Sequence, residues 1–259
     1  MGRVLITGAA GRIGGYLRAG LPGLGWHLRL LDVEPIADRH ADEETVVGSV
    51  LDAGTIRDAC DGVDAVVHLA ATTGRSMDWE AASDDIAATR GVLEAARCAG
   101  ITRVVYASSN HAVGFQPRGE RPAPDWSYPR PDTFYGVAKV ASEALGSLYV
   151  DRYGMHVVCL RIGTCRERPN NVRSLSTWLS PADAARLVGA ALTAPSPGFR
   201  VVWGVSANTR NWWSLDGARE LGYQPQDDAE AYADEVLREA TPSDPEDPEH
   251  RLVGGGFTR

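Results

Sequence analysis

The sequence has neither an excess of positive charge nor a long apolar run, and each absence excludes a class of protein. Its 259 residues carry a formal net charge of -8 and an isoelectric point near 5.3, so no basic stripe is available to bind the phosphates of a nucleic acid. No apolar stretch approaches the roughly 18 residues of a membrane span. The first residues lack the charged start and apolar stretch of a signal peptide. We therefore expect a soluble, cytoplasmic protein that binds neither nucleic acid nor membrane.

Cysteine is also scarce, and its spacing excludes two kinds of site. Cys60, Cys98, Cys159 and Cys165 form no C-x-x-C pair, which favours reduced thiols in the cytoplasm over a disulfide framework. We expect each to be a free cysteine of the ordinary buried kind. No cluster of histidine and cysteine has the spacing of metal ligands, so we predict no metal.

Short apolar segments alternate with helical patterns over the first two thirds of the sequence. Runs of Val, Leu and Ile without strict polar alternation are typical of strands covered on both faces. The predicted strands are 3–7, 28–31, 45–47, 65–69, 104–107 and 157–160, and the predicted helices are 12–21, 55–60, 83–99 and 134–153. This alternation predicts an α/β fold with a doubly wound parallel sheet.

A segment with regularly spaced glycines connects the first predicted strand to the first predicted helix. Gly8, Gly11 and Gly14 follow the pattern G-x-x-G-x-x-G, which permits a tight turn, a close approach of backbone to pyrophosphate and close packing of helix on strand. The start of the helix offers unpaired N–H groups to phosphates, and Arg12 there either contacts phosphate or is solvated. The pattern predicts that this junction binds a dinucleotide.

Two carboxylates follow at later strand ends. Asp32 ends the second predicted strand, 18 residues after Gly14, where a carboxylate accepts both hydroxyls of an adenosine ribose. Because it would also repel a 2′-phosphate, we predict NAD rather than NADP as the cofactor. Asp52 follows the third strand and has two open interpretations, contact with the adenine amino group or the N-cap of the next helix.

Tyr135 and Lys139 lie four residues apart in the predicted helix 134–153, which places both side chains on one face. A nearby ammonium favours the phenolate and lowers the pKa of a tyrosine from its usual value of about 10. Such a pair occurs by chance on many helices, so its meaning depends on its surroundings. Ser109 ends the fifth predicted strand at the carboxyl edge of the sheet, where its hydroxyl can reach a substrate oxygen beside Tyr135.

The glycine spacing, Asp32 and the set of Ser109, Tyr135 and Lys139 resemble the short-chain dehydrogenase/reductase superfamily, in its extended branch of NAD-dependent epimerases and dehydratases. Longer motifs over nearly the whole chain are more specific and resemble the uronate dehydrogenase family. They are ASSNHAVG at 107–114, RPD at 130–132, YGVAK at 135–139, LRIGTC at 160–165, PNN at 169–171, LSTW at 175–178, VVWG at 201–204, SAN at 206–208 and WW at 212–213.

The resemblance implies a reaction and roles for its residues. Tyr135 is implied to be the acid/base, Lys139 to hold the nicotinamide ribose and lower the pKa of the tyrosine, and Ser109 to share the hydrogen bond to the reacting oxygen. The implied reaction oxidises the anomeric carbon of a cyclic hexuronic acid, D-glucuronate or D-galacturonate, with hydride passing to NAD and an aldarolactone as product. The family's carboxylate-clamping arginine matches Arg173, a role that suits a planar guanidinium. From the residues alone, Arg173 is as readily a solvated loop residue.

The remaining site residues are also implied by the resemblance. The substrate contacts match Thr73, Ser109, Asn110, His111, Tyr135 and Thr164. The cofactor contacts include Arg12, Ile13, Leu69, Ala70, Ala71 and Ile162 beside the glycines and acids named above. His111 has an alternative interpretation as a structural histidine. A homo-oligomer is expected.

The last third of the sequence has a mixed pattern. It predicts a helix at 181–194, a strand at 199–203 and a helix at 214–221, after a proline-rich loop at 116–131. We expect a Rossmann-type dinucleotide-binding core at 1–165 and a small substrate-capping region at 166–259. Helix 181–194 and strand 199–203 should pack back on the core, so that the whole is one compact unit. The acidic, proline-rich segment 241–249 is expected to be an extended tail.

Three positions depart from the family, and two other functions stay open. Asp85 stands where relatives commonly carry asparagine, so it keeps the hydrogen-bond acceptor and loses the donor, which affects the proton relay behind Lys139. Thr73 and Thr164 stand where serines are usual. One alternative is a nucleotide-sugar epimerase or dehydratase, which usually has a larger and more basic C-terminal domain. The other is a non-catalytic NAD-binding regulator, which typically lacks the tyrosine or the lysine.

Overall fold

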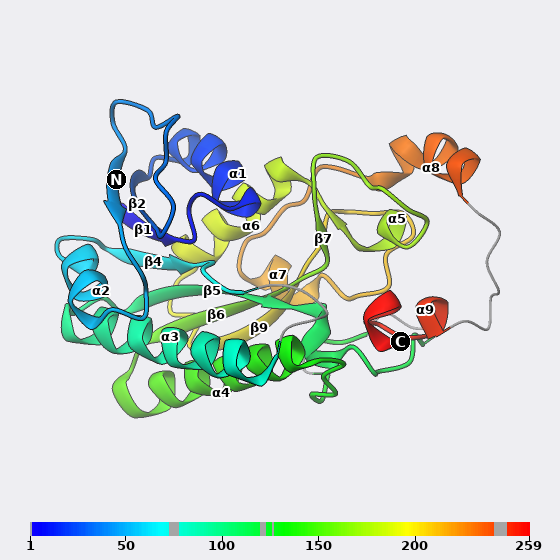
Figure 1. The fold of residues 1–259 in the computed structure, drawn as a ribbon. Helices are drawn as coiled ribbons and strands as arrows, with labels where there is room; N and C mark the ends of the chain where they lie inside the picture. The colour runs from blue at the N-terminus through cyan, green and yellow to red at the C-terminus, as the bar shows by residue number, and fades with distance from the viewer. Residues whose placement is uncertain (1, 73–77, 120–122, 126, 241–247) are drawn as a thin grey trace.

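The computed structural model describes residues 2–72, 78–119, 123–125, 127–240 and 248–259. Figure 1 shows a central sheet with helices on both faces. In the described residues the sheet has seven strands, all paired in parallel, in the order β3-β2-β1-β4-β5-β6-β9. The strands are β1 (Arg3–Thr7), β2 (His27–Asp32), β3 (Glu44–Val47), β4 (Ala65–His68), β5 (Arg103–Ser109), β6 (His156–Ile162) and β9 (Phe199–Gly204). The predicted doubly wound α/β fold is confirmed, and the order reverses between β1 and β4, where such sheets bind ligands.

The helices divide between the two faces of the sheet. Helices α3 and α4 run along one face with α2 beside α3, and α1 and α6 pack together on the other. The longer helices are α1 (Arg12–Gly20), α2 (Ala53–Cys60), α3 (Trp79–Cys98), α4 (Phe134–Tyr153), α6 (Pro181–Thr193) and α8 (Ala233–Glu239). The shorter ones are α5 (Ser174–Thr177), α7 (Asp216–Glu220), α9 (Pro248–Arg251) and the 3₁₀ turns η1 (Pro22–Leu24), η2 (Asn110–Val113), η3 (Ala229–Tyr232) and η4 (Gly255–Thr258). None of the helices that the structure describes is both long and apolar enough to cross a membrane.

The two faces of the sheet are covered because side chains alternate along each strand. In β1, Val4 and Ile6 face α1 and α6, while Leu5 faces α2, α3 and α4, and all three are fully buried. Burial of such a side chain stabilises the fold by about 1.5–3 kcal/mol. Strands covered in this way carry apolar residues at consecutive positions, which is the pattern that predicted them.

Helix boundaries follow from capping side chains. The prediction 134–153 for α4 is confirmed at both ends, because Thr133 caps its start and Gly154, at φ +67°, ends it. Helix α3 begins four residues before the predicted 83, because the carboxylate of Asp78 accepts the Ala81 N–H at 2.9 Å. The apolar pattern alone did not indicate that first turn, where Trp79 is half exposed.

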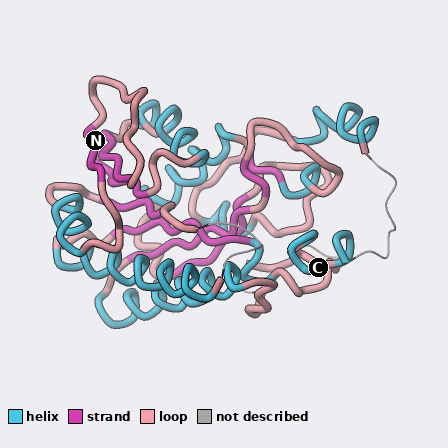
Figure 2. The backbone as a smooth tube through the Cα atoms, in the orientation of Figure 1, coloured by secondary structure: helices cyan, strands magenta, loops and turns pink. Residues whose placement is uncertain are grey.

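Apart from α6, the last third of the chain consists of short helices and strands that are joined by loops, drawn pink in Figure 2. A two-stranded parallel sheet joins β7 (Thr164–Cys165) to β8 (Trp178–Leu179). Strand β9 pairs with β6, and α6 packs against α1. Both elements therefore return to the main sheet, while the division into a core at 1–165 and a capping region at 166–259 stays a prediction.

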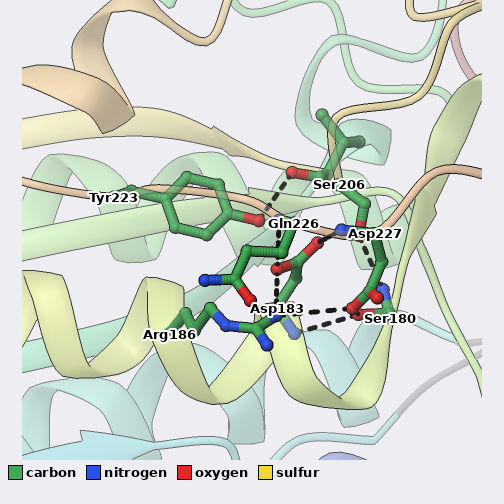
Figure 3. A network of polar contacts seen from close by, with 8 residues as sticks. Ser180, Asp183, Arg186, Ser206, Tyr223, Gln226 and Asp227 are labelled. Atoms are coloured by element: carbon green, nitrogen blue, oxygen red, sulfur yellow. Dashed lines mark hydrogen bonds and ion pairs between the residues drawn. The ribbon is translucent and has the colours of Figure 1, made fainter.

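A buried carboxylate fastens α6 to the chain that follows α7 (Figure 3). Asp183 is fully buried and accepts the N–H groups of Gln226 at 2.9 Å and Asp227 at 3.0 Å. Its third partner is Arg186, at 2.6 Å, and Ser180 caps the helix through the Asp183 N–H. Because each oxygen has partners, the charge is compensated inside the protein.

The segment at 241–249 differs in part from the expected extended tail. Residues 241–247 lie outside the described residues, but Pro248–Arg251 forms helix α9, so the prediction is wrong for its last two positions. The following residues, 252–257, lie beside the loop that begins at Gly114: Pro117 and Leu252 form an antiparallel bridge, and Gly254 donates its N–H to Gly114 O at 2.8 Å. Figure 1 shows this red end of the chain next to that loop.

Candidate active site

The glycine segment forms a cradle against the end of β4. Gly8 has φ +71°, and a Cβ there would lie 2.6 Å from the Ala70 nitrogen. A Cβ on Gly14 would lie 2.4 Å from Ala9 O, so α1 can pack this closely only with glycine. Gly11 precedes α1 and offers no side-chain cap, which leaves N–H groups of the first turn open to an anionic group.

Asp32 connects this cradle to the end of β2. Its Oδ2 accepts the Ala10 N–H at 2.9 Å, and its Oδ1 accepts the Glu34 N–H at 3.1 Å. Each carboxylate oxygen has further acceptor capacity, and the residue lines the cleft beside the glycines. The geometry fits the predicted contact with ribose hydroxyls.

Asp52 is the carboxylate for which the sequence allowed two interpretations, a cofactor contact or an N-cap. It is the N-cap of α2, where Oδ1 accepts the Thr55 N–H at 2.7 Å. This hydrogen bond to Thr55 lowers the pKa of the carboxyl group. The preceding residues 48–51 line the cleft and Asp52 does not, so the geometry favours the N-cap over the predicted cofactor contact.

A cleft of about 980 Å³ joins the glycine cradle to the predicted catalytic residues, a volume typical of ligand sites. Every predicted cofactor residue except Asp52 lines it. Of the predicted substrate contacts, Ser109, Asn110, His111, Tyr135 and Thr164 line it. Thr73 lies outside the described residues. Within the part of the chain that the structure describes, no group of three or more acidic, histidine or cysteine residues is arranged to hold a metal ion.

Tyr135 and Lys139 are presented by the first turns of α4. Thr133 accepts the Gly136 N–H at 3.1 Å and so starts the helix at the cleft wall. The ammonium of Lys139 lies 5.2 Å from the ring centre of Tyr135 and 4.9 Å from that of Tyr106, within cation–π range. The expected juxtaposition of phenol and ammonium is therefore present.

The protonation of this pair differs from the expectation. Burial raises the pKa of Tyr135 to about 12, against a hydrogen bond with Ser109 that lowers it. Burial also lowers the pKa of Lys139 to about 8, while the charge of Asp85 raises it. In this structure the expected lowering of the Tyr135 pKa is therefore not seen, because desolvation of the phenolate outweighs the hydrogen bond from Ser109.

Two adjacent serines end β5, and they differ in their hydrogen-bond partners. Ser108 donates to Glu143 at 2.6 Å, and Glu143 is held in a buried pair with Arg161 at 2.8 Å. Ser109 instead accepts the His111 N–H at 3.2 Å and hydrogen-bonds with Tyr135. Ser109 is therefore the serine placed to act beside the phenol, as predicted.

His111 is held on several sides. Its Nδ1 lies 2.7 Å from Oδ2 of Asp132, whose side chain is fully buried. Its ring stacks on Phe257 with centres 3.9 Å apart and meets Tyr135 edge-on at 5.8 Å. Because Nδ1 faces the carboxylate, Nε2 is the nitrogen left for other contacts. Neither Asp132 nor Phe257 was predicted as a site residue, and the fixed ring suits a structural role as well as a substrate contact.

Arg173 lies just outside the cleft lining, where the segment 252–257 covers it. It donates from Nη2 to the carbonyl of Val253, and its guanidinium lies 5.5 Å from the ring centre of Trp212. Asn110 donates its amide N–H to the same carbonyl at 3.1 Å. No sequence signal pointed to Val253, because its part in the site comes from a backbone oxygen.

Asp85 lines the cleft near Lys139. Its Oδ1 accepts the Thr72 N–H at 2.9 Å, whereas its buried Oδ2 has no hydrogen-bond partner among the described residues. Burial raises the pKa of this carboxyl group. Thr164, the other departure that the structure describes, shares a hydrogen bond of 2.9 Å with the Thr177 hydroxyl.

Comparison with known proteins places the chain in a family. The model of the NAD dependent epimerase/dehydratase family matches residues 4–198, and the chain belongs to that family. It is 39% identical to the uronate dehydrogenase of Agrobacterium fabrum over 257 residues, 99% of this chain and 97% of the relative.

Two solved structures are similar over the full length. A glucuronic acid dehydrogenase from Chromohalobacter salexigens superposes with a TM-score of 0.94 at 37% identity, covering 99% of this chain and 96% of the other. A mutant of the uronate dehydrogenase from Agrobacterium tumefaciens, in complex with NAD, gives a TM-score of 0.93 at 37% identity, covering 100% of this chain and 97% of the other.

Proposed function

We propose that the protein is an NAD-dependent uronate dehydrogenase that oxidises the anomeric carbon of D-glucuronate or D-galacturonate to the aldarolactone. The observation that carries the proposal is the single cleft in which the glycine cradle, Tyr135 with Lys139 and Ser109, and the group around Asn110 come together. The full-length likeness to uronate dehydrogenases supports the same activity.

The residues of the cradle fit NAD. Gly8 and Gly14 leave the space that a Cβ would fill, and the open N–H groups at the start of α1 suit the pyrophosphate. The carboxylate of Asp32 suits the two ribose hydroxyls and repels a phosphorylated ribose. When bound, NAD accepts the hydride that leaves the substrate carbon.

Tyr135 removes the proton from the anomeric hydroxyl. Ser109 hydrogen-bonds to the same oxygen and keeps it oriented toward the phenol. Lys139, with a pKa of about 8, is protonated at neutral pH, and its positive charge favours the phenolate. Because burial raises the pKa of Tyr135 to about 12, we expect turnover to rise with pH.

Arg173 binds the carboxylate of the uronate, and the side chains of Asn110, His111 and Thr164 contact the sugar hydroxyls. A guanidinium suits this task because it donates two parallel hydrogen bonds to a carboxylate. In a protein with a net charge of -8, an anionic substrate needs such a local cation.

We also propose a cytoplasmic homo-oligomer. Free cysteines at all four positions suit a reducing compartment. Exposed aromatic side chains at the start of α3 and α4, Trp79 and Phe134, contact each other at 5.8 Å and form an apolar patch suited to a second copy. Size-exclusion chromatography with light scattering would give the mass, and a monomer would contradict this part.

The decisive experiment mixes purified protein with NAD and either D-glucuronate or D-galacturonate and follows NADH absorbance. We expect reduction of NAD with at least one acid and little with D-glucose. NAD binding without turnover of either acid would remove the proposed activity and favour the non-catalytic regulator. Activity only with a nucleotide sugar would favour the epimerase or dehydratase alternative.

The carboxylate clamp has its own test in Arg173→Ala. We expect kcat/KM for the uronate to fall about 100-fold, since a charge-assisted contact contributes up to about 3 kcal/mol. The preference for uronate over D-glucose should fall with it, while the Kd for NAD stays unchanged. An unaltered preference would contradict the clamp.

A further inference from the structure

We propose that the segment 252–257 is a positioning element of the substrate site. In this view its backbone sets the guanidinium of Arg173 and the amide of Asn110, and its phenyl ring sets the imidazole of His111. This inference rests on the proposed function, since it concerns how the same site recognises a uronate.

The segment pairs through its backbone with the loop that follows η2. Val253 donates its N–H to Gln116 O at 2.9 Å, next to the bridge between Pro117 and Leu252. Val253 is 3% exposed. Such backbone pairing fixes the register of the segment against the site. A tail without these hydrogen bonds would have no fixed register.

Two glycines let the segment approach the partner of His111. A Cβ on Gly114 or on Gly254 would lie 1.9 Å from Oδ2 of Asp132. The carboxylate that binds His111 therefore lies between these two glycines, one in the loop and one in the segment. Contact this close is possible only because neither position carries a side chain.

One backbone oxygen then connects two predicted substrate residues. The carbonyl of Val253 accepts from Asn110 at 3.1 Å and from Nη2 of Arg173. A carbonyl oxygen has two lone pairs and can accept both hydrogen bonds. The donors come from η2 and from the residue that precedes α5, so this oxygen sets the spacing between two elements that are far apart in sequence.

Gly255 brings the backbone under the guanidinium. It has φ +60°, and a Cβ there would lie 2.7 Å from Nε of Arg173 and 2.9 Å from its Cδ. On its other contact, the Cζ of Arg173 lies over the ring of Trp212, 5.5 Å from the ring centre. The side chain of Arg173 is thus confined by the segment and by the indole, which reduces the rotamer freedom it must lose when it binds a carboxylate.

Phe257 completes the wall at the same end of the cleft. Its ring stacks on His111 at 3.9 Å with 25° between the planes, and it lines the cleft. Asp132 holds the imidazole by Nδ1. Stacking and hydrogen bond together fix both the tilt and the in-plane rotation of His111.

The first test compares two glycine substitutions. Gly255→Ala places a methyl group against Arg173, whereas Gly198→Ala, at a similar φ of +64°, meets nothing within 4 Å. Both positions have a similar positive φ, so the difference between the two variants reports the contact with Arg173. We expect Gly255→Ala to raise the KM for D-glucuronate about tenfold and to leave the KM for NAD unchanged. A KM for D-glucuronate equal to that of Gly198→Ala would overturn the proposal.

A double substitution separates positioning from general stability. If Gly255 acts through Arg173, adding Gly255→Ala to Arg173→Ala should change kcat/KM for D-glucuronate by less than twofold. Multiplicative losses in the double variant would show a separate effect and would contradict the proposal. Circular dichroism of each variant checks that the fold is retained.

Phe257 keeps the inference testable if Gly255→Ala does not fold. We expect Phe257→Ala to raise the KM for D-glucuronate several-fold and Phe257→Tyr to restore it, because the ring is what contacts His111. Tyr128→Ala, an exposed aromatic position, is the control and should match the unaltered protein. No difference between Phe257→Ala and the control would sink the proposal. An unaltered protein that oxidises no uronate would instead refute the proposed function itself, and this inference with it.

Discussion

The two ends of the cleft are built in different ways. The cofactor end is organised around one short segment: Gly8, Gly11 and Gly14 lie at its regular spacing, and the carboxylate of Asp32, 22 residues from Ala10, accepts the Ala10 N–H at 2.9 Å. The substrate end joins pieces from across the chain, such as Arg173 and Val253, which are 80 residues apart. A local turn of this kind can be read from spacing alone, whereas an assembly of distant pieces depends on the packing of the whole chain.

A glycine with a positive φ serves each end of the cleft, but its purpose can be predicted from the sequence at the cofactor end only. Gly8 at φ +71° and Gly255 at φ +60° both adopt a left-handed conformation and both leave room for a neighbour. Gly8 belongs to a spaced motif with a known physical purpose. Gly255 has its purpose only because Arg173 lies against it, and nothing in the adjacent sequence indicates this.

The largest effect should come from the side chain at which the two ends meet. Tyr135→Phe removes the proton acceptor and should lower kcat about 1,000-fold, while the Kd for NAD, measured by fluorescence titration, changes less than threefold. This result would show that Tyr135 acts in the chemical step and contributes little to the binding of NAD. Retained turnover would remove Tyr135 from the mechanism.

The network that holds α6 to residues 226–227, away from both ends of the cleft, should be broken by Asp183→Ala. Loss of the buried carboxylate leaves two backbone N–H groups without their acceptor and leaves Arg186 with only its longer contact to Asp227, at a cost of about 3–5 kcal/mol in the free energy of unfolding. Urea denaturation measures this quantity, and Asp151→Ala, at an exposed position, is the control. Equal midpoints for the two variants would show that the network of Figure 3 contributes little.

The cofactor end should be sensitive at one glycine and insensitive at the next. Gly14→Ala places a Cβ 2.4 Å from Ala9 O, whereas Gly15→Ala meets nothing within 4 Å. We expect the first to weaken NAD binding about 100-fold, or about 2.7 kcal/mol, and the second to leave it unchanged. Calorimetric titration decides, and similar Kd values would mean that this turn does not shape the site.

The smallest effect concerns Asp85, beside the catalytic pair. Its negative charge raises the pKa of both Tyr135 and Lys139, so Asp85→Asn should lower both. In the proposed mechanism oxidation needs the deprotonated phenol, and the pH at half-maximal kcat should therefore move down, by about one unit or less.

Asp151→Asn, at an exposed position of α4, provides the control for this shift. The other groups that bear on Asp85 are the N–H of Thr72, the ammonium of Lys139 and the charge of Asp84, and both variants leave them in place. A profile that moves equally in both variants, or moves up in Asp85→Asn, would contradict the assigned role.

Much of the fold followed from local signals. The predicted bounds of α4 agree with the structure because Thr133 and Gly154 cap the helix at these positions, and the strands could be predicted because both of their faces are apolar. The tetrad of Gly8, Gly14, Asp32 and Ser109 could be placed at one edge because parallel strands end together.

The rest depended on burial and on backbone atoms. The raised pKa of Tyr135 reflects how deeply the phenol is enclosed, which no spacing of residues reports. The role of Asp52 as an N-cap was one of two interpretations that the sequence could not separate. The contacts of Phe257 and Val253 with the site arise because a distant segment returns to it.

The carboxylate of Asp32 has a consequence for anyone who would alter the cofactor preference. Besides its proposed contact with the ribose, it stabilises the turn, since its two oxygens accept the Ala10 and Glu34 N–H groups. A redesign that exchanges it for a neutral side chain, to admit a phosphorylated ribose, would also remove these two hydrogen bonds from the turn that is proposed to bind the pyrophosphate. Conversion to NADP in this protein therefore requires a replacement that also accepts these two N–H groups. Removal of the repelling charge alone should weaken the binding of both cofactors.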